Sequence, residues 1–496
     1  MTSLSETSLL AGASGQSTGY TIDQSIRFND NDSPELKKTF SSAGTEETFT
    51  FSCWFKRGNI GANLGGSGNH GVSLFSGGSS GENYGEIRID SSGSGTQDAL
   101  HFYNINSGSF NMQLLTTRLF RDVSAWYHIV CVMDTTNAIA SERLRIYVNG
   151  IRETNFGTET YPSKDTASYF NTATEHGVGN APPTNQARHF DGYLAEIHFL
   201  DGYAYGPEYF GEFKEDTNIW IPKEYTGSYG CNGFKIDGRD SSDLGDDESG
   251  NGNDFASSGL ASHDQMADSP TNNFAVMNII DSHTTPNWTA SNGNLDISWV
   301  GPNYTNHLFS SLSMPPTGKW YFEIKFVSDS NQILYYQAMR IGLMRDDISA
   351  SDRQNAYNSV DLTDSTTDPE IYLVLGNAGN SCQLKGMGSN IYNVGGSISA
   401  GDVINFARNG ANLWIGKNGT YYNSGNPATG SNPSLSNLQL RSYRANMHWT
   451  ATSTSHGTAV LNAFFGADKS VGSGTGFNNT VPTGFLALNT INLGEA

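Results

Sequence analysis

Pairs of carboxylates on predicted β-strands are the residues of this chain that could do acid–base chemistry. A retaining glycosidase needs two carboxylates about 5 Å apart, which on a strand means alternate positions on one face. Glu196 and Asp201 are five positions apart, so a regular strand directs them to opposite faces. Glu86 and Asp90 share a face, but no third acid accompanies them. The spacing therefore disfavours a hydrolase, and we expect no enzyme activity and no catalytic residues.

Acidic side chains that could bind a cation are densest at 237–254, with seven acids against one arginine. No Glu closes a twelve-residue loop there, so the stretch does not fit an EF-hand. Its end, 249–255, matches only half of one calcium-binding Gly-Asp repeat. We interpret 237–254 as a solvated acidic turn and leave the metal ligands unassigned. We expect no cofactor, with Ca²⁺ as the one cation that such acidic loops would suit.

Cysteine and histidine give no motif of their own. The four cysteines lack CxxC spacing, which argues against zinc, and Cys53 and Cys131 fit small buried apolar groups within strands. The chain has no HExxH, GxSxG or Walker loop. His128 and His198 lie inside predicted strands, and we interpret both as structural.

The composition predicts an all-β protein. Aromatic residues make up 11% and charged residues only 16%, and there are 56 Gly but 15 Pro. Many aromatics with many turn formers are typical of antiparallel sheets joined by tight turns. The net charge of -21 disfavours phosphate backbones and anionic membrane surfaces. We therefore expect no nucleic-acid partner. No apolar run approaches the length of a membrane span, so we also expect no membrane insertion.

Alternating strands dominate the first half. Trp126–Asp134 is nearly continuous in apolar residues, as a central sandwich strand would be. Phe49–Lys56 alternates, which predicts a strand buried on one face only. The predicted inner set is Phe49, Phe51, Cys53 and Phe55, and the outer set is Thr50, Ser52, Trp54 and Lys56.

The second half repeats this pattern. In Lys319–Phe326 the side chains of Trp320, Phe322, Ile324 and Phe326 are predicted to face inward, and those of Tyr321, Glu323 and Lys325 outward. In Gly401–Tyr422 two β-rich runs each end in Asn-Gly, which predicts two tight hairpins.

These patterns predict two antiparallel β-sandwich (jelly-roll) domains in tandem, joined by an irregular connector. The predicted boundaries are an amino-terminal arm at 1–18, a first sandwich at 19–205, an acidic Gly/Asp-rich connector at 206–289 and a second sandwich at 290–496.

Four segments of the first sandwich carry a family resemblance. They are Phe51-Ser-Cys-Trp-Phe, Ala125-Trp-Tyr-His-Ile-Val, Leu144-Arg-Ile-Tyr-Val-Asn-Gly and Phe190-Asp-Gly-Tyr-Leu-Ala-Glu-Ile. In order and spacing they resemble the laminin G-like, concanavalin A-like jelly roll. That family includes lectins, adhesion modules and some β-glucanases, so the resemblance implies binding or, as an alternative, carbohydrate hydrolysis.

The second sandwich resembles a SPRY domain, a recognition module that binds through loops. The segments are Trp320-Tyr-Phe-Glu-Ile, Ile341-Gly-Leu, Gly401-Asp-Val-Ile, Leu413-Trp-Ile-Gly-Lys-Asn-Gly and Phe464-Phe-Gly. The chain departs from the family in reading Ala463-Phe464-Phe465-Gly466 where Asn-Phe-Gly is usual, and in extra residues at 469–479. As ligand-binding residues we name Tyr335, Tyr336, Tyr421 and Tyr422, of which alternation places about half in the core.

Asp268–Asn278 and Pro482–Leu493 resemble segments of bacteriophage structural proteins. The resemblance implies a virion protein, assembled in the host cytoplasm, that decorates the head or forms part of a fibre. It implies binding to a host-surface glycan or protein, docking on other virion proteins through the arm, and a homo-oligomer such as a trimer. The alternatives are a purely structural capsid cement and a carbohydrate-active hydrolase.

Overall fold

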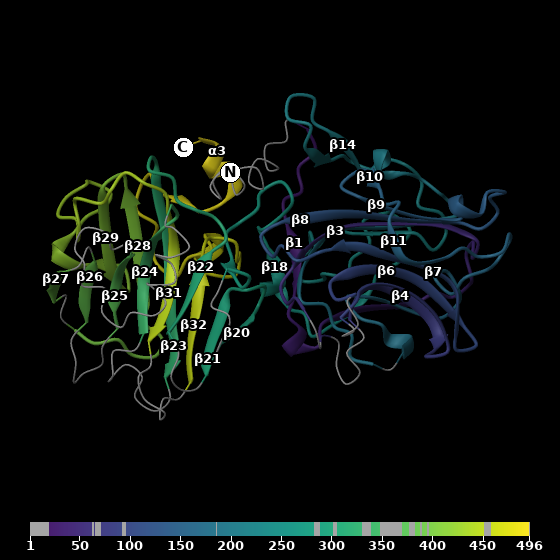
Figure 1. Cartoon of the computed structure of the whole chain (residues 1–496), viewed down its shortest axis with the longest axis horizontal. Helices are drawn as coiled ribbons and strands as arrows, with labels where there is room; N and C mark the ends of the chain where they lie inside the picture. Colours follow the sequence, from purple (N-terminus) through teal and green to yellow (C-terminus); the bar gives the residue numbers. More distant parts are fainter. Residues whose placement is uncertain are drawn as a thin grey trace. The chain divides into compact units, whose positions relative to one another are not determined.

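The computed structural model describes residues 19–61, 64, 71–91, 96–184, 186–281, 288–300, 305–329, 339–347, 370–375, 382–386, 389–393, 396–450 and 458–495. They form two compact units: one reaches to Asn272 and includes Ser291–Gly293, and the other holds the remaining residues from Asn273 on. Each unit is built from two sheets whose strands are nearly all antiparallel (Figure 1). Within these ranges the one α-helix is α3 (Thr490–Glu495), and no helix is long and apolar enough to cross a membrane. The predicted all-β class is confirmed.

The first unit stacks two eight-stranded sheets. The β3 sheet has the order β10-β9-β8-β3-β13-β1-β18, with β16 paired to β13, and the β6 sheet has the order β11-β7-β6-β5-β4-β12-β2-β17. The strands of the β3 sheet are β1 (Ser25–Phe28), β3 (Thr48–Arg57), β8 (Trp126–Asp134), β9 (Leu144–Val148), β10 (Ile151–Arg152), β13 (Gly192–Asp201), β16 (Phe234–Ile236) and β18 (Gln265–Met266). Those of the β6 sheet are β2 (Glu35–Thr39), β4 (Val72–Ser80), β5 (Asn83–Ile89), β6 (Ala99–Asn106), β7 (Ser109–Leu119), β11 (Phe156–Thr160), β12 (Glu175–Val178) and β17 (Ala256–Ser258).

The predicted connector is divided between the units. Its part up to Asn272 adds β16, β17 and β18 to the edges of both sheets of the first unit. The same part forms a two-stranded sheet of β14 (Gly211–Phe213) and β15 (Trp220–Pro222). The residues between β13 and β18, which were predicted to be an irregular connector, are therefore part of the folded first unit.

Strand β3 is buried on both faces. As predicted, Phe49, Phe51, Cys53 and Phe55 enter the core between the sheets, where Cys131 is also buried. The opposite face was predicted to be open to water and is not, because Thr50, Ser52, Trp54 and Lys56 are all at most 5% exposed. The covering residues come from far along the chain: the Thr50 hydroxyl donates to the carbonyl of Tyr203 at 2.8 Å. Alternation alone therefore misjudges this strand.

A buried ion pair fixes the last covering segment. Lys56 Nζ donates to Asp268 Oδ2 at 2.8 Å, and both side chains are fully buried. The other oxygen, Asp268 Oδ1, accepts from Trp126 Nε1 at 3.0 Å. Each partner meets the hydrogen-bonding need of the other, as a charge without water requires.

The second unit also has two sheets. The β31 sheet has the order β19-β22-β31-β24-β25-β26-β27, and the β23 sheet has the order β20-β21-β32-β23-β28-β29-β30, with β33 parallel to β23. The strands of the β31 sheet are β19 (Met277–Asn278), β22 (Thr305–Ser310), β24 (Met339–Arg345), β25 (Glu370–Val374), β26 (Gln383–Gly386), β27 (Ser389–Asn393) and β31 (Tyr443–Thr450). Those of the β23 sheet are β20 (Trp288–Ser291), β21 (Asp296–Val300), β23 (Lys319–Asp329), β28 (Val403–Asn409), β29 (Asn412–Lys417), β30 (Thr420–Tyr421), β32 (Thr458–Phe464) and β33 (Leu486–Ala487).

The outer face of β23 corrects a second prediction. Tyr321 and Glu323 were predicted to face solvent, yet they are 1% and 0% exposed. Tyr321 packs with Trp414 and Phe477 in a cluster that the C-terminal segment closes. Glu323 accepts the backbone N–H of Asn478 and that of Asn479 at 2.7 and 2.9 Å. The extra residues at 469–479 thus continue into a lid on this sheet.

We expect removal of the Lys56 charge to destabilise the first unit strongly. Lys56→Met leaves the Asp268 carboxylate buried without its cation, which costs about 3 to 5 kcal/mol of unfolding free energy. The matched control is Lys164→Met, because Lys164 pairs with Asp165 at 3.2 Å while both side chains are more than half exposed. Urea unfolding of the intact protein should show a change below about 1 kcal/mol for the control. Equal effects of both variants would contradict the assignment.

We expect Glu323→Gln to loosen the C-terminal lid. A glutamine amide nitrogen cannot accept, so the N–H of Asn478 or Asn479 loses its acceptor. Hydrogen exchange at these two amides should become about tenfold faster or more, since a bond to a charged acceptor contributes about 1.5 to 3 kcal/mol. Lys325→Gln, on the same strand and face, is the control and should leave the rates unchanged. Unchanged rates in Glu323→Gln would show that apolar packing alone holds the lid.

Candidate functional site

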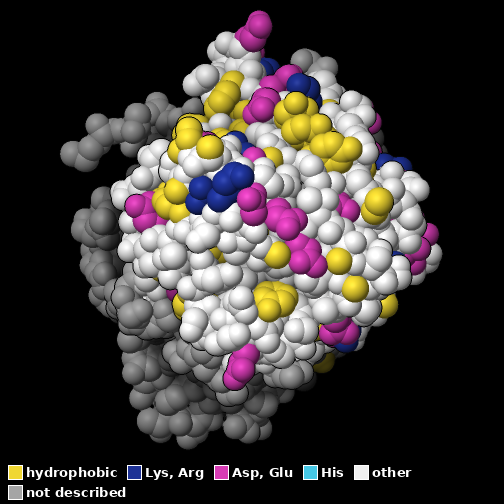
Figure 2. Space-filling view, turned by 90° about the vertical axis from the view of Figure 1, so that its right-hand side faces the viewer, with side chains coloured by type: hydrophobic (Ala, Val, Ile, Leu, Met, Phe, Trp, Pro, Cys, Tyr) yellow, Lys and Arg dark blue, Asp and Glu magenta, His cyan; other side chains and the backbone are white. Residues whose placement is uncertain are grey.

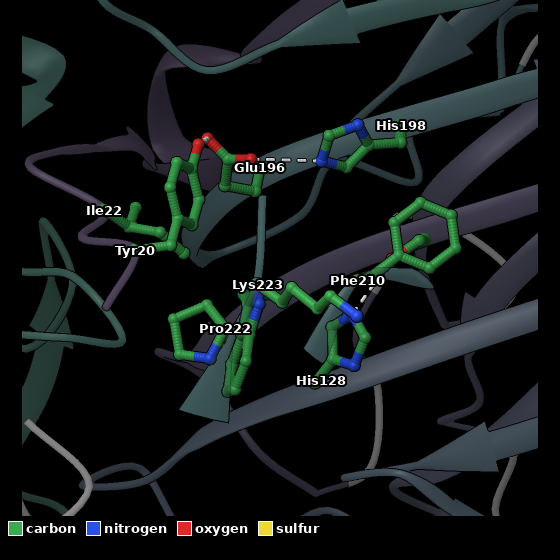
Figure 3. Close-up of a pocket in the computed structure, with 10 residues that line it drawn as sticks. Tyr20, Ile22, His128, Glu196, His198, Phe210, Pro222 and Lys223 are labelled. Atoms are coloured by element: carbon green, nitrogen blue, oxygen red, sulfur yellow. Dashed lines mark hydrogen bonds and ion pairs between the residues drawn. The ribbon is translucent and has the colours of Figure 1, made fainter. Parts of the chain in front are cut away.

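Residues on the outer face of the β3 sheet line a narrow pocket that has no room for a water molecule. Strands β3, β8 and β13 form its floor, and the amino-terminal stretch of the unit and the segment after β13 form its walls (Figure 3). The lining residues are Tyr20, Ile22, Ser52, Trp54, His128, Glu196, His198, Phe210, Pro222 and Lys223.

Glu196 reaches this pocket because β13 is bulged. The pairing of β13 with β3 shifts register between Ala195 and His198, and Glu196 has a φ of 47°, in the left-handed region. A bulge re-aims one side chain relative to the regular alternation. A non-glycine residue held at positive φ is also costly, and such positions concentrate at functional sites. The bulge therefore directs the Glu196 side chain into the pocket.

Three donors converge on the Glu196 carboxylate. Tyr20 donates its hydroxyl to Oε1 at 2.8 Å, and Lys235 Nζ lies 3.3 Å from the same oxygen. His198 Nε2 lies 3.1 Å from Oε2, and in Figure 3 the Tyr20 hydroxyl and the His198 ring approach the carboxylate from different sides. Burial alone would raise the pKa of Glu196, but the hydrogen bonds and charges of His198, Lys235 and Tyr20 outweigh burial and lower its pKa to about 2. Glu196 is therefore an anion, suited to accept hydrogen bonds and unsuited to supply a proton.

Ser52 and His128 are in contact but do not form a nucleophile–base pair. Trp220 Nε1 can only donate, so His128 Nδ1, at 3.0 Å, accepts. In the neutral ring Nε2 then carries the proton and donates to Ser52 Oγ at 2.9 Å. Burial lowers the pKa of His128 to about 3, with a smaller effect of His198, which keeps the ring neutral near pH 7. A ring in this state cannot take the hydroxyl proton of Ser52.

The carboxylate pairs considered from the sequence are separated or enclosed. Asp201 is held by Asn171 Nδ2 at 2.6 Å and by the N–H of Thr45 and of Asn232, in a network apart from that of Glu196. Glu86 is fully buried against Arg188 and Tyr103. Its partner Asp90 accepts from the hydroxyl of Thr96 at 2.9 Å. Neither pair presents two carboxylates to a shared open site.

Within the described ranges no group of three His, Cys, Asp or Glu is placed to hold a metal ion. In the acidic stretch, Asp247 accepts the backbone N–H of Lys235, Ser249 and Asn253 at 2.8 to 2.9 Å. Its oxygens are thus engaged in holding the turn.

The four tyrosines named from the sequence do not come together in one described site. Tyr335 and Tyr336 lie outside the described residues. Tyr421, at the end of β30, packs against the cluster of Tyr321, Trp414 and Phe477, and burial raises its pKa above the usual value. Tyr422 begins a short 3₁₀ turn and is half-buried.

Sequence reasoning missed the pocket because its walls are remote in the chain. Tyr20 and Lys223 belong to segments predicted as the start of the sandwich and as connector, with no periodic pattern to place them. One signal was available: four of the eight residues at 203–210 are aromatic, which is unusual for an exposed connection.

We expect Glu196 to contribute acid-dependent stability. Its pKa in the folded protein, about 2, lies below its ordinary value of 4.5. The stabilisation is therefore present above about pH 4.5 and is lost as the pH falls toward 2, by about 3 kcal/mol. Glu196→Gln lacks this titration, so its unfolding free energy should fall less between pH 5 and pH 2 than that of the wild type. Glu208→Gln, which alters an exposed carboxylate, is the control, and a Glu196→Gln profile parallel to the wild type would refute the assignment.

Comparison with known proteins identifies the first sandwich. Residues 25–204 match Laminin_G_3, described as the concanavalin A-like lectin/glucanases superfamily. The matched span contains β1 to β13, and thus Glu196, His198 and the floor of the pocket. No curated protein matches the sequence of the chain.

Several solved structures match the chain at low identity. A heptameric SAP-like pentraxin from Limulus polyphemus is 15% identical over 37% of this chain and 78% of its own, with a TM-score of 0.27. Domains LG4-5 of the mouse laminin alpha1 chain are 9% identical over 90% of both chains, with a TM-score of 0.28. Lectin I-B4 from Griffonia simplicifolia is 10% identical over 37% of this chain and 92% of its own, with a TM-score of 0.26. Likenesses this distant add nothing to the family match, which establishes that residues 25–204 carry a laminin G-like, concanavalin A-like domain.

Proposed function

We propose that the protein is a bacteriophage virion-surface protein, in a fibre or as head decoration, that binds a host-surface glycan or protein. The match of residues 25–204 to a superfamily of lectins and glucanases supports a carbohydrate-related binding role. The virion location rests on the resemblance of Asp268–Asn278 and Pro482–Leu493 to bacteriophage structural proteins. The resemblance of 290–496 to SPRY domains adds a second module suited to recognition.

The observation that carries the proposal is the state of the polar side chains on the outer face of the β3 sheet. Glu196 is ionised and has three donors, and His128 donates to Ser52, so neither is placed for proton transfer. Hydrolysis would need a side chain that can exchange a proton with the substrate, and neither residue is in that state. This arrangement favours adhesion over hydrolysis.

Assembly on the particle follows from the same proposal. Residues 1–18 dock the protein on other virion proteins, and symmetric packing gives a homo-oligomer such as a trimer. Cement without host binding is the rival role, and it predicts loss of particle stability when the protein is missing.

The proposal is tested by incubating the intact purified protein with host cells and with polysaccharide from their surface, with and without excess chelator. We expect the protein to sediment with the cells and the polysaccharide to keep its length. No retention, together with fragile particles lacking the protein, would support the cement role. New reducing ends would establish a hydrolase, and retention lost only in chelator would show that Ca²⁺ takes part.

A further inference from the structure

Three tyrosines just after β13 stack on one another at the surface of the first unit. The rings of Tyr203 and Tyr205 lie 5.3 Å apart at 29°, and those of Tyr205 and Tyr209 lie 4.1 Å apart at 9°. Tyr205 is therefore the middle ring and Tyr209 an end ring. Tyr209 is 42% exposed, and no second aromatic ring among the described residues packs on it. Tyr209 is thus the most exposed ring of the stack.

The stack is held rigidly from below. The Thr50 hydroxyl donates to the carbonyl of Tyr203 at 2.8 Å and accepts the N–H of Tyr205 at 2.9 Å. Tyr203 and Tyr205 pack on a buried cluster that includes Val130, Leu200 and Phe210. The 3₁₀ turn Pro207–Tyr209 then carries the chain to the end ring. A platform fixed in this way loses little side-chain entropy when a ligand binds.

A fourth tyrosine, Tyr225, belongs to the buried cluster on which Tyr203 and Tyr205 pack. Burial, and then the neighbouring Tyr205, Tyr203 and Tyr209, raise the pKa of Tyr225. Tyr225 itself donates to the carbonyl of Ser228 at 2.7 Å. Flat apolar faces beside several hydroxyls match a sugar ring, which has C–H groups on its faces and hydroxyls on its rim.

The segment that carries the stack is rich in exposed carboxylates, and one cation, Arg145, places Nη2 3.5 Å from the carbonyl of Ala204. Glu208, Glu212 and Glu224 are exposed on the same segment, while the exposed Lys223 donates to the carbonyl of Glu208 at 3.2 Å. The chain as a whole has a net charge of -21. An acidic polysaccharide would meet repulsion here, whereas a neutral one would not.

Figure 2 shows a face on which apolar side chains form small separate groups between charged and uncharged surface. A permanent protein interface would need a large continuous apolar area, which this face does not show.

We propose that Tyr209 stacks on the face of a neutral sugar ring of a host-surface polysaccharide, which extends the tyrosine stack by one ring. The tyrosine hydroxyls at the rim of the stack accept and donate hydrogen bonds to the sugar hydroxyls. The proposal rests on the proposed adhesion function and gives it a ligand class and a contact residue.

The test measures binding of the intact protein to an immobilised panel of purified bacterial polysaccharides, neutral and uronate-bearing. We expect binding to neutral members, at least about tenfold weaker in Tyr209→Ala, because a stacked aromatic anchor typically carries this much affinity. Tyr209→Phe keeps the ring face and should stay within about threefold of the wild type. Phe110→Ala removes an aromatic side chain that is 46% exposed on β7 of the other sheet, and should leave binding unchanged.

The outcomes separate this inference from the proposed function. Wild-type binding that Tyr209→Ala and Tyr205→Ala leave intact overturns the tyrosine platform while adhesion stands. Binding to acidic members alone overturns the ligand class. If the protein is retained on host cells but binds no polysaccharide, adhesion is to a protein receptor and the inference is overturned. If the protein is not retained on cells, the adhesion function itself is overturned. Melting curves of the two Tyr209 variants should match the wild type within a few degrees, since 42% of the Tyr209 side chain is exposed.

Discussion

The outer face of the β3 sheet carries buried apolar residues as well as the inner face, and much of the first unit follows from the need to cover them. Val130, Val132 and Leu200 form a buried cluster with Phe210, Tyr225 and Tyr229, which come from the segment after β13. Burying each such side chain contributes about 1.5 to 3 kcal/mol, so the covering segment is required for stability. The segment therefore belongs to the sandwich, and the surface that it presents replaces the bare sheet.

Covering a sheet that also carries polar residues requires every buried charge to find a partner. Lys56 meets Asp268 and Trp126, and Glu196 meets Tyr20, His198 and Lys235. The second unit uses the same solution, in which Glu323 accepts from the backbone of the C-terminal segment. In each case one buried charged side chain fixes the position of a segment that is remote in sequence. Apolar contacts alone would fix that position less precisely.

Local pattern was enough to predict most of the framework. Periodicity predicted the inward residues of β3 and the central apolar strand β8. The Asn-Gly pairs predicted the two hairpins around Trp414. In the second hairpin Asn418 and Gly419 both have positive φ, as the turn requires. In the first, Asn409 still pairs with Asn412, so the two loop residues are Gly410 and Ala411. The outer faces were wrongly predicted to be exposed because the segments that cover them are remote in sequence. Thr50 and Tyr203, which are hydrogen-bonded, are 153 residues apart in the chain. The bulge that turns Glu196 into the pocket has no signature in a single sequence, and neither has the convergence of Tyr20 on it.

The central claim is that the segment covering the β3 sheet forms the ligand-binding face of the protein. Hydrogen exchange of the intact protein, with and without host-surface polysaccharide, tests it most directly because it reports contacts along the whole chain. The account predicts that the ligand slows exchange mainly at the amides of 203–229 and the adjoining end of β13. Protection confined to the second unit, or no change anywhere while the protein stays bound, would contradict it.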